Sequence, residues 1–189
     1  RDIKAMGREY PFPVAVTLSV GERDYETYRY CRQCGADRYL IKHETSDEAL
    51  YNRYHPHSSL ERRLQCQKWL YELGYELGGG FMVGLPGQTY ETLKNDILLL
   101  KTMKVSMAGI GPYISHHATP LAGSPHGSPE LTRRVLAVAR LILPQVHLPS
   151  TTALNLKGGK EAALSGGANV VMNKVTPLKY RALYDLYEP

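Results

Sequence analysis

The chain has 189 residues, 43% of them hydrophobic and 22% charged, a balance typical of one globular domain rather than of a disordered or fibrous segment. Its net charge of +5 comes from lysines and arginines scattered among acidic residues, which argues against nucleic-acid binding, and no apolar run is long enough for a membrane span or a secretion signal. Three cysteines without a regular framework argue against a disulfide-rich secreted domain, so we expect one cytoplasmic domain over residues 1–189 with reduced thiols.

Strand and helix patterns alternate along the chain. Residues 1–7 read as the end of a helix closed by Gly7, with no helix start before it. Short β-branched or glycine-rich apolar runs predict strands at 14–20, 38–44, 78–85, 108–114, 146–148 and 168–172. Helical spacing with start and stop residues predicts helices at 23–34, 60–73, 91–103, 129–143, 160–164 and 177–187.

These units recur about every 30 residues, which is typical of parallel βαβ units and fits both a doubly wound sheet and a barrel. A closed (β/α)8 barrel takes about 250 residues, so six units leave a barrel two units short. Either the sheet is open or the chain is truncated. The helix end at residues 1–7 favours truncation, with a part of the protein preceding Arg1.

Polar side chains gather where the predicted strands end, which is where parallel α/β folds place their sites. The residues at these ends are Thr17 and Ser19, then Lys42, His43 and Glu44, then Met82 and Gly84, then His116 and His117, then Ser150, Thr151, Thr152 and Ala153, and finally Asn173. Hydroxyls, backbone amides and glycine turns offer an anionic or neutral ligand many hydrogen bonds. Taken alone, Lys42 is equally well explained as the solvated start of a loop.

Other features have plainer explanations. His116 and His117 have no third ligand spaced to join them, so we expect surface histidines and no metal site. Cys31 and Cys34 form a CxxC that could be redox active or half a zinc site, but both fall near the end of a helix and no second CxxC exists. Of Arg62 and Arg63, only one can face inward on a helix, where a guanidinium would suit a carboxylate.

Four runs carry a resemblance to a known family: 36–45, 82–89, 109–121 and 149–153. They resemble radical S-adenosylmethionine (SAM) enzymes of the biotin synthase-like group, and most of all the HydE family of FeFe-hydrogenase maturases. The run Met-Val-Gly-Leu-Pro-Gly-Gln-Thr is shared by several radical SAM families, whereas the runs around Glu44 and Thr151 point to HydE. The resemblance covers essentially the whole chain in order. It implies an α/β fold, a TIM-like radical SAM barrel of which about strands three to eight are present.

The resemblance also implies residue roles. Lys42 and Glu44 would lie near the ribose and methionine parts of S-adenosylmethionine, Arg63 would pair with its carboxylate, and Met82 and Gly84 would pack beside its adenine. Lys42 stands where the family is expected to have arginine, so it keeps the charge but loses the bidentate fork. A cavity for an anionic or thiol-bearing substrate would be lined by Thr17, Ser19, Thr151, Thr152, Ala153 and Tyr184.

One family feature is absent from the sequence. Radical SAM catalysis needs a CxxxCxxC loop whose three thiolates bind a 4Fe-4S cluster, and this sequence has no such spacing. The resemblance implies that the loop lies upstream of Arg1 and that the chain alone is inactive. The full protein would cleave S-adenosylmethionine reductively and act on a small iron- or sulfur-containing precursor during H-cluster assembly, beside other hydrogenase maturation proteins.

Two rival interpretations remain open at this point. The first is a biotin synthase-like or methylornithine synthase-like radical enzyme with a different substrate, against which an anion site at Thr151 and Thr152 would favour the HydE family. The second is a barrel remnant without a cluster that acts as a binding or scaffold protein. A cluster motif encoded in frame upstream of Arg1 would argue against this second interpretation.

Overall fold

The structure is a computed structural model that describes residues 2–155, 160–173 and 175–184. Within these residues, six strands follow one another in chain order: β1 (Thr17–Leu18), β2 (Arg38–Leu40), β3 (Glu76–Val83), β4 (Met107–Pro112), β5 (Pro149–Ser150) and β6 (Val170–Val171). All neighbouring strands are parallel, in the orders β1-β2-β3-β4 and β5-β6. A bridge between Met107 and His147 joins β4 to the segment that leads into β5.

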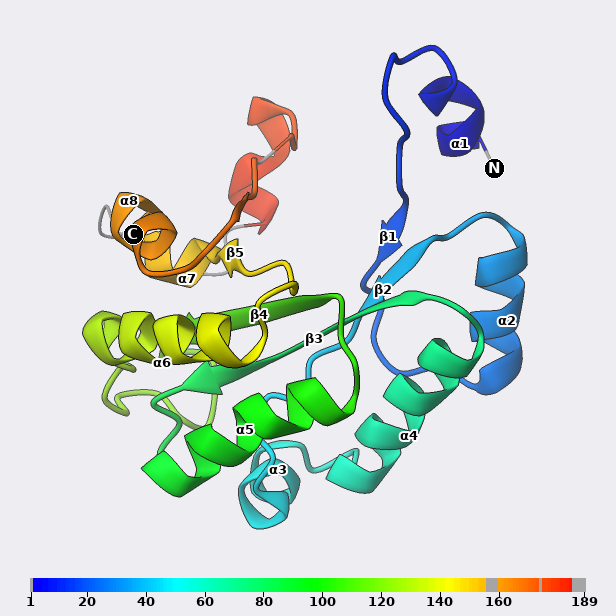
Figure 1. Cartoon of the computed structure of the whole chain (residues 1–189). Helices are drawn as coiled ribbons and strands as arrows, with labels where there is room; N and C mark the ends of the chain where they lie inside the picture. The colour runs from blue at the N-terminus through cyan, green and yellow to red at the C-terminus, as the bar shows by residue number, and fades with distance from the viewer. Residues whose placement is uncertain (1, 156–159, 174, 185–189) are drawn as a thin grey trace.

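Helices connect the strands and cover one face of the sheet (Figure 1). In chain order the helices are α1 (Asp2–Gly7), α2 (Tyr25–Gln33), α3 (Glu48–Tyr54), α4 (Leu60–Glu72), α5 (Tyr90–Thr102), α6 (Pro129–Ile142), α7 (Thr152–Asn155), α8 (Lys160–Ser165) and the 3-10 helix η1 (Leu178–Tyr184). Of these, α1 and η1 lie apart from the sheet (Figure 1). Leu70, Leu100 and Leu136 of α4, α5 and α6 are fully buried in the core between these helices and the strands. Parallel strands in chain order with their helices on one side form part of a TIM-like barrel, as predicted.

The two faces of β3 show which side is the inside of the barrel. A Cβ on Gly79 would meet Leu100 and Val105, which belong to the helix side. Since side chains alternate along a strand, Gly78 faces the interior, whereas a Cβ on Gly80, at a φ of +151°, would meet the backbone of Gly109 on β4. On β4, the interior positions are again glycines, Gly109 and Gly111. The inner wall of β3 and β4 is therefore largely bare backbone.

Side chains from the flanking strands lie over this glycine wall. A Cβ on Gly78 would lie 2.9 Å from Leu40, one on Gly109 would lie 3.5 Å from Cε of Lys42, and one on Gly111 would lie 2.8 Å from Oγ1 of Thr151. The wall thus leaves room for side chains that come from β2 and from the end of β5.

The helix starts follow from side-chain caps. Asp24, Ser59, Thr89 and Ser128 each accept a hydrogen bond from a backbone N–H in the first turn of α2, α4, α5 and α6, respectively. These helices begin within two residues of their predicted starts. The short helices α3 and α7 were not predicted; α3 begins at a further cap, in which Asp47 accepts from the Leu50 N–H.

Several strands differ from their predicted runs. The run 146–148 leads into β5, which lies at Pro149–Ser150, and β6 keeps only Val170–Val171 of the run 168–172. Two more strands are shorter than predicted, for identifiable reasons. The run 14–20 contributes only Thr17–Leu18, because the Val16 N–H donates to the Asp37 carboxylate instead of to a strand. The run 38–44 yields β2 over Arg38–Leu40, after which the backbone turns at Glu44.

The predictions at the two ends of the chain also change. Gly7 is the last residue of α1 and lacks the positive φ of a helix-ending glycine; the glycine instead leaves room for Val14, whose Cβ lies 2.9 Å from where a Gly7 Cβ would project. The predicted helix at 177–187 is a 3-10 helix as far as Tyr184, and its last three residues lie outside the described residues.

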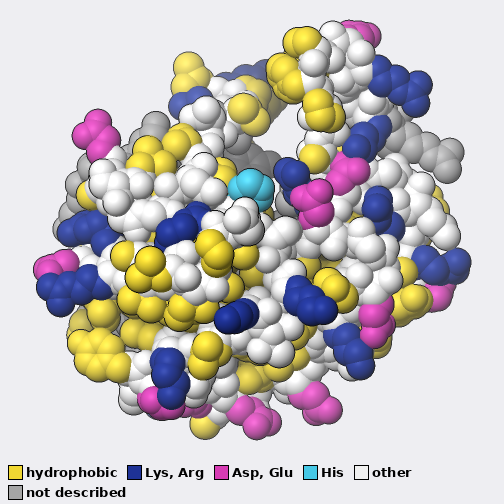
Figure 2. All heavy atoms as spheres, viewed as in Figure 1, with side chains coloured by type: hydrophobic (Ala, Val, Ile, Leu, Met, Phe, Trp, Pro, Cys, Tyr) yellow, Lys and Arg dark blue, Asp and Glu magenta, His cyan; other side chains and the backbone are white. Residues whose placement is uncertain are grey.

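In the described part of the chain, no helix is long and apolar enough to cross a membrane. On the face shown in Figure 2, lysines and arginines are interspersed with aspartates and glutamates, as their order in the sequence predicts.

Candidate functional site

Lys42 and Glu44 follow β2 at the carboxyl end of the strands. The Lys42 Nζ lies 3.9 Å from Oε2 of Glu44, and the two side chains are 33% and 21% exposed. This distance is long for an ion pair. Oε2 of Glu44 is buried and has no hydrogen-bond partner in the described residues. A buried carboxylate oxygen without a donor is costly and marks a place where a ligand is expected to supply one.

Glu44 also has an unusual backbone. Its φ is +65°, and the Thr45 N–H donates to the His43 carbonyl across it, so Glu44 is the centre of a tight three-residue γ-turn. Two ladder bonds with β3 hold the turn: the Glu44 N–H donates to Gly80 O, and the Met82 N–H donates to Glu44 O. Non-glycine residues with positive φ cost free energy and concentrate at functional sites.

Met82 and Gly84 end β3 beside this turn. Gln88 binds both: its Oε1 accepts from the Gly84 N–H at 2.6 Å, and its Nε2 donates to Met82 O at 2.8 Å. Gly84 has a φ of +89°, and a Cβ there would lie 2.5 Å from Cα of Gly127. The glycine is therefore required by its φ and by the close approach of a second loop. The predicted contacts of Met82 and Gly84 with adenine stay predictions.

Arg63 is the inward arginine of the pair on α4. Its Nε donates to Oε1 of Glu22 at 2.7 Å and to Oη of Tyr51 at 2.9 Å, and its Nη1 donates to the Lys42 carbonyl at 3.1 Å. Arg62 instead lies over the Trp69 ring at 4.9 Å. Arg63 therefore touches the Lys42 backbone, which places it beside the Glu44 segment.

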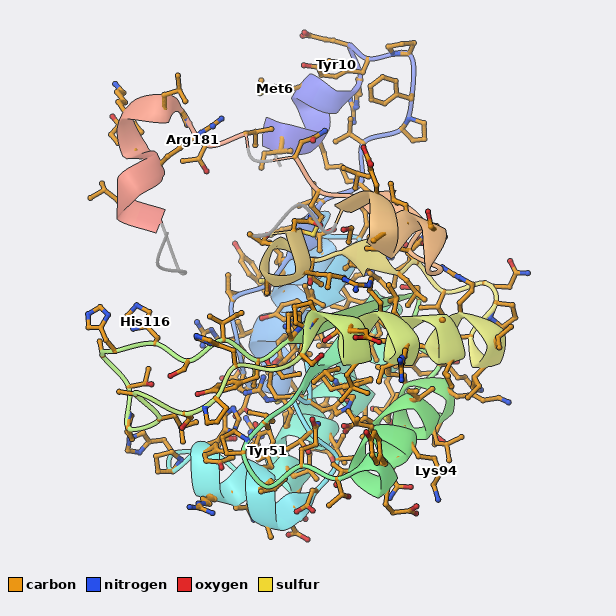
Figure 3. The ribbon with its side chains drawn as sticks, turned by 90° about the vertical axis from the view of Figure 1, so that its left-hand side faces the viewer. Met6, Tyr10, Tyr51, Lys94, His116 and Arg181 are labelled. Atoms are coloured by element: carbon orange, nitrogen blue, oxygen red, sulfur yellow. The ribbon has the colours of Figure 1, made fainter. Side chains whose placement is uncertain are left out.

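Glu22 is a residue of this network that the sequence reasoning missed. It follows Gly21, just past the predicted strand 14–20, so the rule that polar residues gather at strand ends could have found it. Besides Arg63, it accepts hydrogen bonds from Ser58 Oγ at 2.8 and 2.9 Å. Burial raises the pKa of Tyr51, so this phenol stays a neutral donor. Tyr51 belongs to α3 and lies in the body of the molecule (Figure 3).

Thr151, Thr152 and Ala153 follow β5 and lead into α7. The Thr151 Oγ1 lies over Gly111 on the inner wall and also accepts from the Leu154 N–H at 3.4 Å. Thr152 is exposed and Ala153 is buried. Lys42 and Thr151 thus lie over two interior glycines of the same strand, β4, whereas Thr152 is the first residue of a helix rather than part of a strand end.

Thr17 and Ser19 lie elsewhere. Thr17 begins β1 rather than ending it, and it lines a cavity of about 160 Å³ at the amino ends of the strands with Arg38 and Ser106. Ser19 is exposed just after β1. The structure does not bring these two residues together with Thr151, so their shared cavity stays a prediction. Tyr184 ends η1, and its side chain lies outside the described residues.

The cysteines and histidines form no metal site in the described ranges, where no three cysteine, histidine or acidic side chains converge. Cys31 lies in α2, Cys34 caps its C-terminus, and Cys66 is buried in α4. His116 points away from the body at the tip of the loop after β4 and stacks on His117 at 4.5 Å (Figure 3). The residues of this chain therefore do not fit a 4Fe-4S cluster.

They do fit a cationic and carboxylate-bearing cofactor beside β2 and β3. Glu44 offers a buried, unbonded carboxylate oxygen and Lys42 offers positive charge, while Arg63, although paired with Glu22, lies beside them on the Lys42 carbonyl. S-adenosylmethionine has hydroxyl and amino groups that can donate to the Glu44 carboxylate, and a carboxylate that can pair with a positive side chain.

Comparisons with known proteins give a consistent assignment. The family described as "Radical SAM superfamily" matches residues 3–100. The chain is 48% identical over 189 residues to the FeFe hydrogenase maturase subunit HydE of Thermotoga maritima, covering 99% of this chain and 53% of that protein. It is 26% identical to the 3-methylornithine synthase of Methanosarcina acetivorans over 82% of this chain and 44% of that protein. The chain thus spans about half the length of the curated relatives it matches.

Solved structures agree on the fold. The structure of methylornithine synthase PylB superposes with a TM-score of 0.78 at 24% identity, covering 89% of this chain and 49% of that one. The maturase HydG from Carboxydothermus hydrogenoformans superposes with a TM-score of 0.68 at 17% identity, covering 85% of this chain and 39% of that one. From its family match and its partial barrel, the chain belongs to the radical SAM superfamily.

Proposed function

We propose that the protein containing this chain is a radical SAM enzyme that cleaves S-adenosylmethionine reductively and acts in the maturation of FeFe hydrogenase. The unbonded carboxylate oxygen of Glu44, held 3.9 Å from Lys42 at the carboxyl end of the partial barrel, is the observation that carries the proposal. The 48% identity to the HydE subunit supports it.

In this proposal, the residues of the chain bind and orient the cofactor. Glu44 accepts hydrogen bonds from the ribose or amino group, and Lys42 balances the carboxylate of Glu44 or of the ligand. Arg63 pairs with the methionine carboxylate through its Nη2, which makes no hydrogen bond to another described residue. Met82 and Gly84 contact the adenine. The bound cofactor supplies the radical chemistry, while the protein positions it and excludes water.

The proposal requires a cluster that these residues do not ligate. We place its CxxxCxxC loop N-terminal to Arg1, in a part of the protein beyond this sequence. Reading the coding sequence upstream of Arg1 tests this placement: an in-frame CxxxCxxC within about two barrel units supports it, and a coding sequence without one would overturn the enzyme assignment.

The substrate side of the proposal rests on Thr151 and its neighbours. We propose that Thr151, Thr152 and Ala153, with Thr17, Ser19 and Tyr184, line the cavity for a small anionic iron- or sulfur-containing precursor, and that the protein works in the cytoplasm beside other hydrogenase maturation proteins. If Thr151→Val combined with Thr152→Val leaves substrate turnover intact, this cavity assignment fails.

A methylornithine synthase-like activity is the second candidate. The observation that favours it is the TM-score of 0.78 with PylB together with 26% identity to a 3-methylornithine synthase. A purified full-length protein that supports hydrogenase activation, and that does not form an amino-acid product in an assay for methylornithine, would favour the first function.

The decisive experiment compares two glutamates in the full-length protein. Glu44→Ala is expected to abolish 5′-deoxyadenosine formation from S-adenosylmethionine under reducing conditions. Glu76→Ala is the matched control, since Glu76 pairs with Arg38 at the opposite end of the strands, and it is expected to retain formation. Unchanged formation with Glu44→Ala would reject the proposed site.

A further inference from the structure

A buried polar cluster lies behind Glu44, on the helix side of the sheet. Asp96 of α5 is fully buried, and His43, which precedes Glu44, is 1% exposed. Nε2 of His43 lies 3.4 Å from Oδ1 of Asp96, and the same oxygen accepts from the Ser46 N–H at 2.5 Å. The proposed cofactor contacts do not use either side chain.

The carboxylate of Asp96 joins the two segments that line the candidate site. Through Ser46 and His43 it holds the segment after β2. Through its other oxygen, Oδ2, which lies 3.4 Å from Nε2 of Gln88, it reaches the side chain that binds Gly84 N–H and Met82 O after β3. Ser46 Oγ adds a contact of 3.4 Å to the Thr92 carbonyl of the same helix.

A buried carboxylate needs partners of this kind, because an unpaired charge in the interior is strongly unfavourable. The Ser46 N–H and the Gln88 amide supply donors to the Asp96 carboxylate, and Nε2 of His43 lies close to the same group. His43 packs against the Phe81 ring at 5.9 Å between ring centroids, which restricts its orientation. Nε2 makes no hydrogen bond in the described residues, so its approach to Oδ1 of Asp96 is a close polar contact and not a hydrogen bond.

The strain at Glu44 needs an anchor. A γ-turn with φ of +65° at a glutamate persists only where surrounding contacts determine it. Its two ladder bonds to β3 fix the centre of the turn, whereas the residues on either side, His43 and Ser46, are fixed from α5 by Asp96. Asp96 is distant in the sequence, but the two residues that it contacts, His43 and Ser46, lie within two positions of Glu44.

We propose that His43 and Asp96 are positioning residues, which hold the Glu44 backbone in its positive-φ turn and so direct the unbonded carboxylate toward the cofactor. This inference rests on the proposed function. Asp96 of α5 and His43, which faces away from the barrel interior, would then contribute to the affinity for S-adenosylmethionine without contacting it.

A double-mutant cycle in the full-length protein tests the inference by equilibrium binding of S-adenosylmethionine. His43→Ala is expected to weaken binding about tenfold, and His43→Gln, whose amide can donate to Asp96, is expected to restore most of it. If His43 acts through Glu44, adding His43→Ala to Glu44→Ala causes no further loss. A residue that merely stabilised the fold would give additive losses and no rescue.

The matched control is Gln67→Leu. Gln67 is equally buried, on α4, and donates to the Ile41 carbonyl two residues before His43. It is expected to lower thermal stability with an unchanged affinity for S-adenosylmethionine. If His43→Ala does not fold, Asp96→Asn replaces it in the cycle, because it keeps the acceptor for Ser46 but loses the charge.

The outcomes separate the two proposals. If Glu44→Ala weakens binding but His43→Ala and Asp96→Asn do not, or if their losses add to that of Glu44→Ala, the positioning role is wrong and the proposed site stands. If Glu44→Ala itself leaves binding unchanged, the cofactor assignment and the positioning role both fall.

Discussion

Charged pairs lie near both ends of β2, and they differ in almost every respect. At the amino end, Nε of Arg38 lies 2.5 Å from Oε2 of Glu76, with side chains 40% and 53% exposed. At the carboxyl end, Lys42 and Glu44 are less exposed and lie 3.9 Å apart, with one carboxylate oxygen buried and unbonded. The amino-end pair is complete without a ligand, whereas the carboxyl-end pair is not.

The difference indicates that residues at one end of the sheet serve stability and residues at the other end serve ligand binding. An exposed ion pair contributes little to stability because water screens it. A strained backbone and an unsatisfied carboxylate cost stability, and a fold keeps them only where they serve another purpose. The comparison predicts that changes at the carboxyl ends uncouple stability from binding and that changes at the amino ends affect stability alone.

Gly80→Ala should have the largest effect. Gly80 has a φ of +151°, and a Cβ there would lie 2.2 Å from the Gly109 carbonyl oxygen, so β3 and β4 would have to separate. We expect a loss of about 3 kcal/mol in the free energy of unfolding, measured by denaturant titration. Gly123→Ala is the control, with a φ of +78° but nothing within 4 Å, and it should lose about 1 kcal/mol. Equal losses would mean that the close approach of the two strands is unimportant.

Glu44→Gly should change stability in the opposite direction. Glycine adopts positive φ without strain, and the substitution removes the unbonded carboxylate, so we expect a gain of about 1 kcal/mol together with loss of S-adenosylmethionine binding. Lys104 is the other non-glycine residue with positive φ among those described, at +52°. Lys104→Gly should give a similar gain with unchanged binding. A destabilised Glu44→Gly would show that the turn carries no strain.

Asp37→Asn tests the amino end through pH. Burial raises the pKa of Asp37, but the hydrogen bonds from Lys4 Nζ and the Val16 N–H outweigh it and hold the pKa below its ordinary value of 3.8. This depressed pKa contributes stability above pH 3.8 that is lost as the pH falls through the folded value. We expect Asp37→Asn to cost about 1 kcal/mol at pH 7 and less in acid, by thermal unfolding at both pH values. A cost that is the same at both would reject the linkage.

Glu76→Gln should have the smallest effect. Because the pair with Arg38 is exposed, we expect a change below about 0.5 kcal/mol in the free energy of unfolding and none in S-adenosylmethionine binding. A change in binding would contradict the separation between the two ends of β2.

Much of the fold could be predicted from the sequence because the signals were local. Short apolar runs and capping residues such as Ser59 and Ser128 predict the order of the strands and helices, and most of their bounds to within a few residues. Helix geometry allows only one of Arg62 and Arg63 to face inward. Arg62 packs over the Trp69 ring, which leaves Arg63 as the inward arginine. Lys42 and Glu44 were found because they follow a strand.

The parts that were missed depend on contacts between distant segments. The length of β1 depends on the Asp37 side chain, and the end of β2 on the turn at Glu44, neither of which has a periodic signal. Asp96 did leave a sign, since it interrupts the apolar face formed by Leu93, Ile97 and Leu100 in α5. A charge on the buried face of a helix predicts a buried partner, but the sequence does not identify His43 as that partner.

The glycine wall of β3 and β4 has a consequence for how the interior can change over evolution. Most barrel interiors are filled by branched side chains from every strand, so a new ligand shape requires several coordinated replacements. Here the space over Gly109 and Gly111 is shaped by Lys42 and Thr151, which come from neighbouring strands. Replacing either of these two side chains would reshape the interior while the backbone wall and the helices behind it stayed as they are.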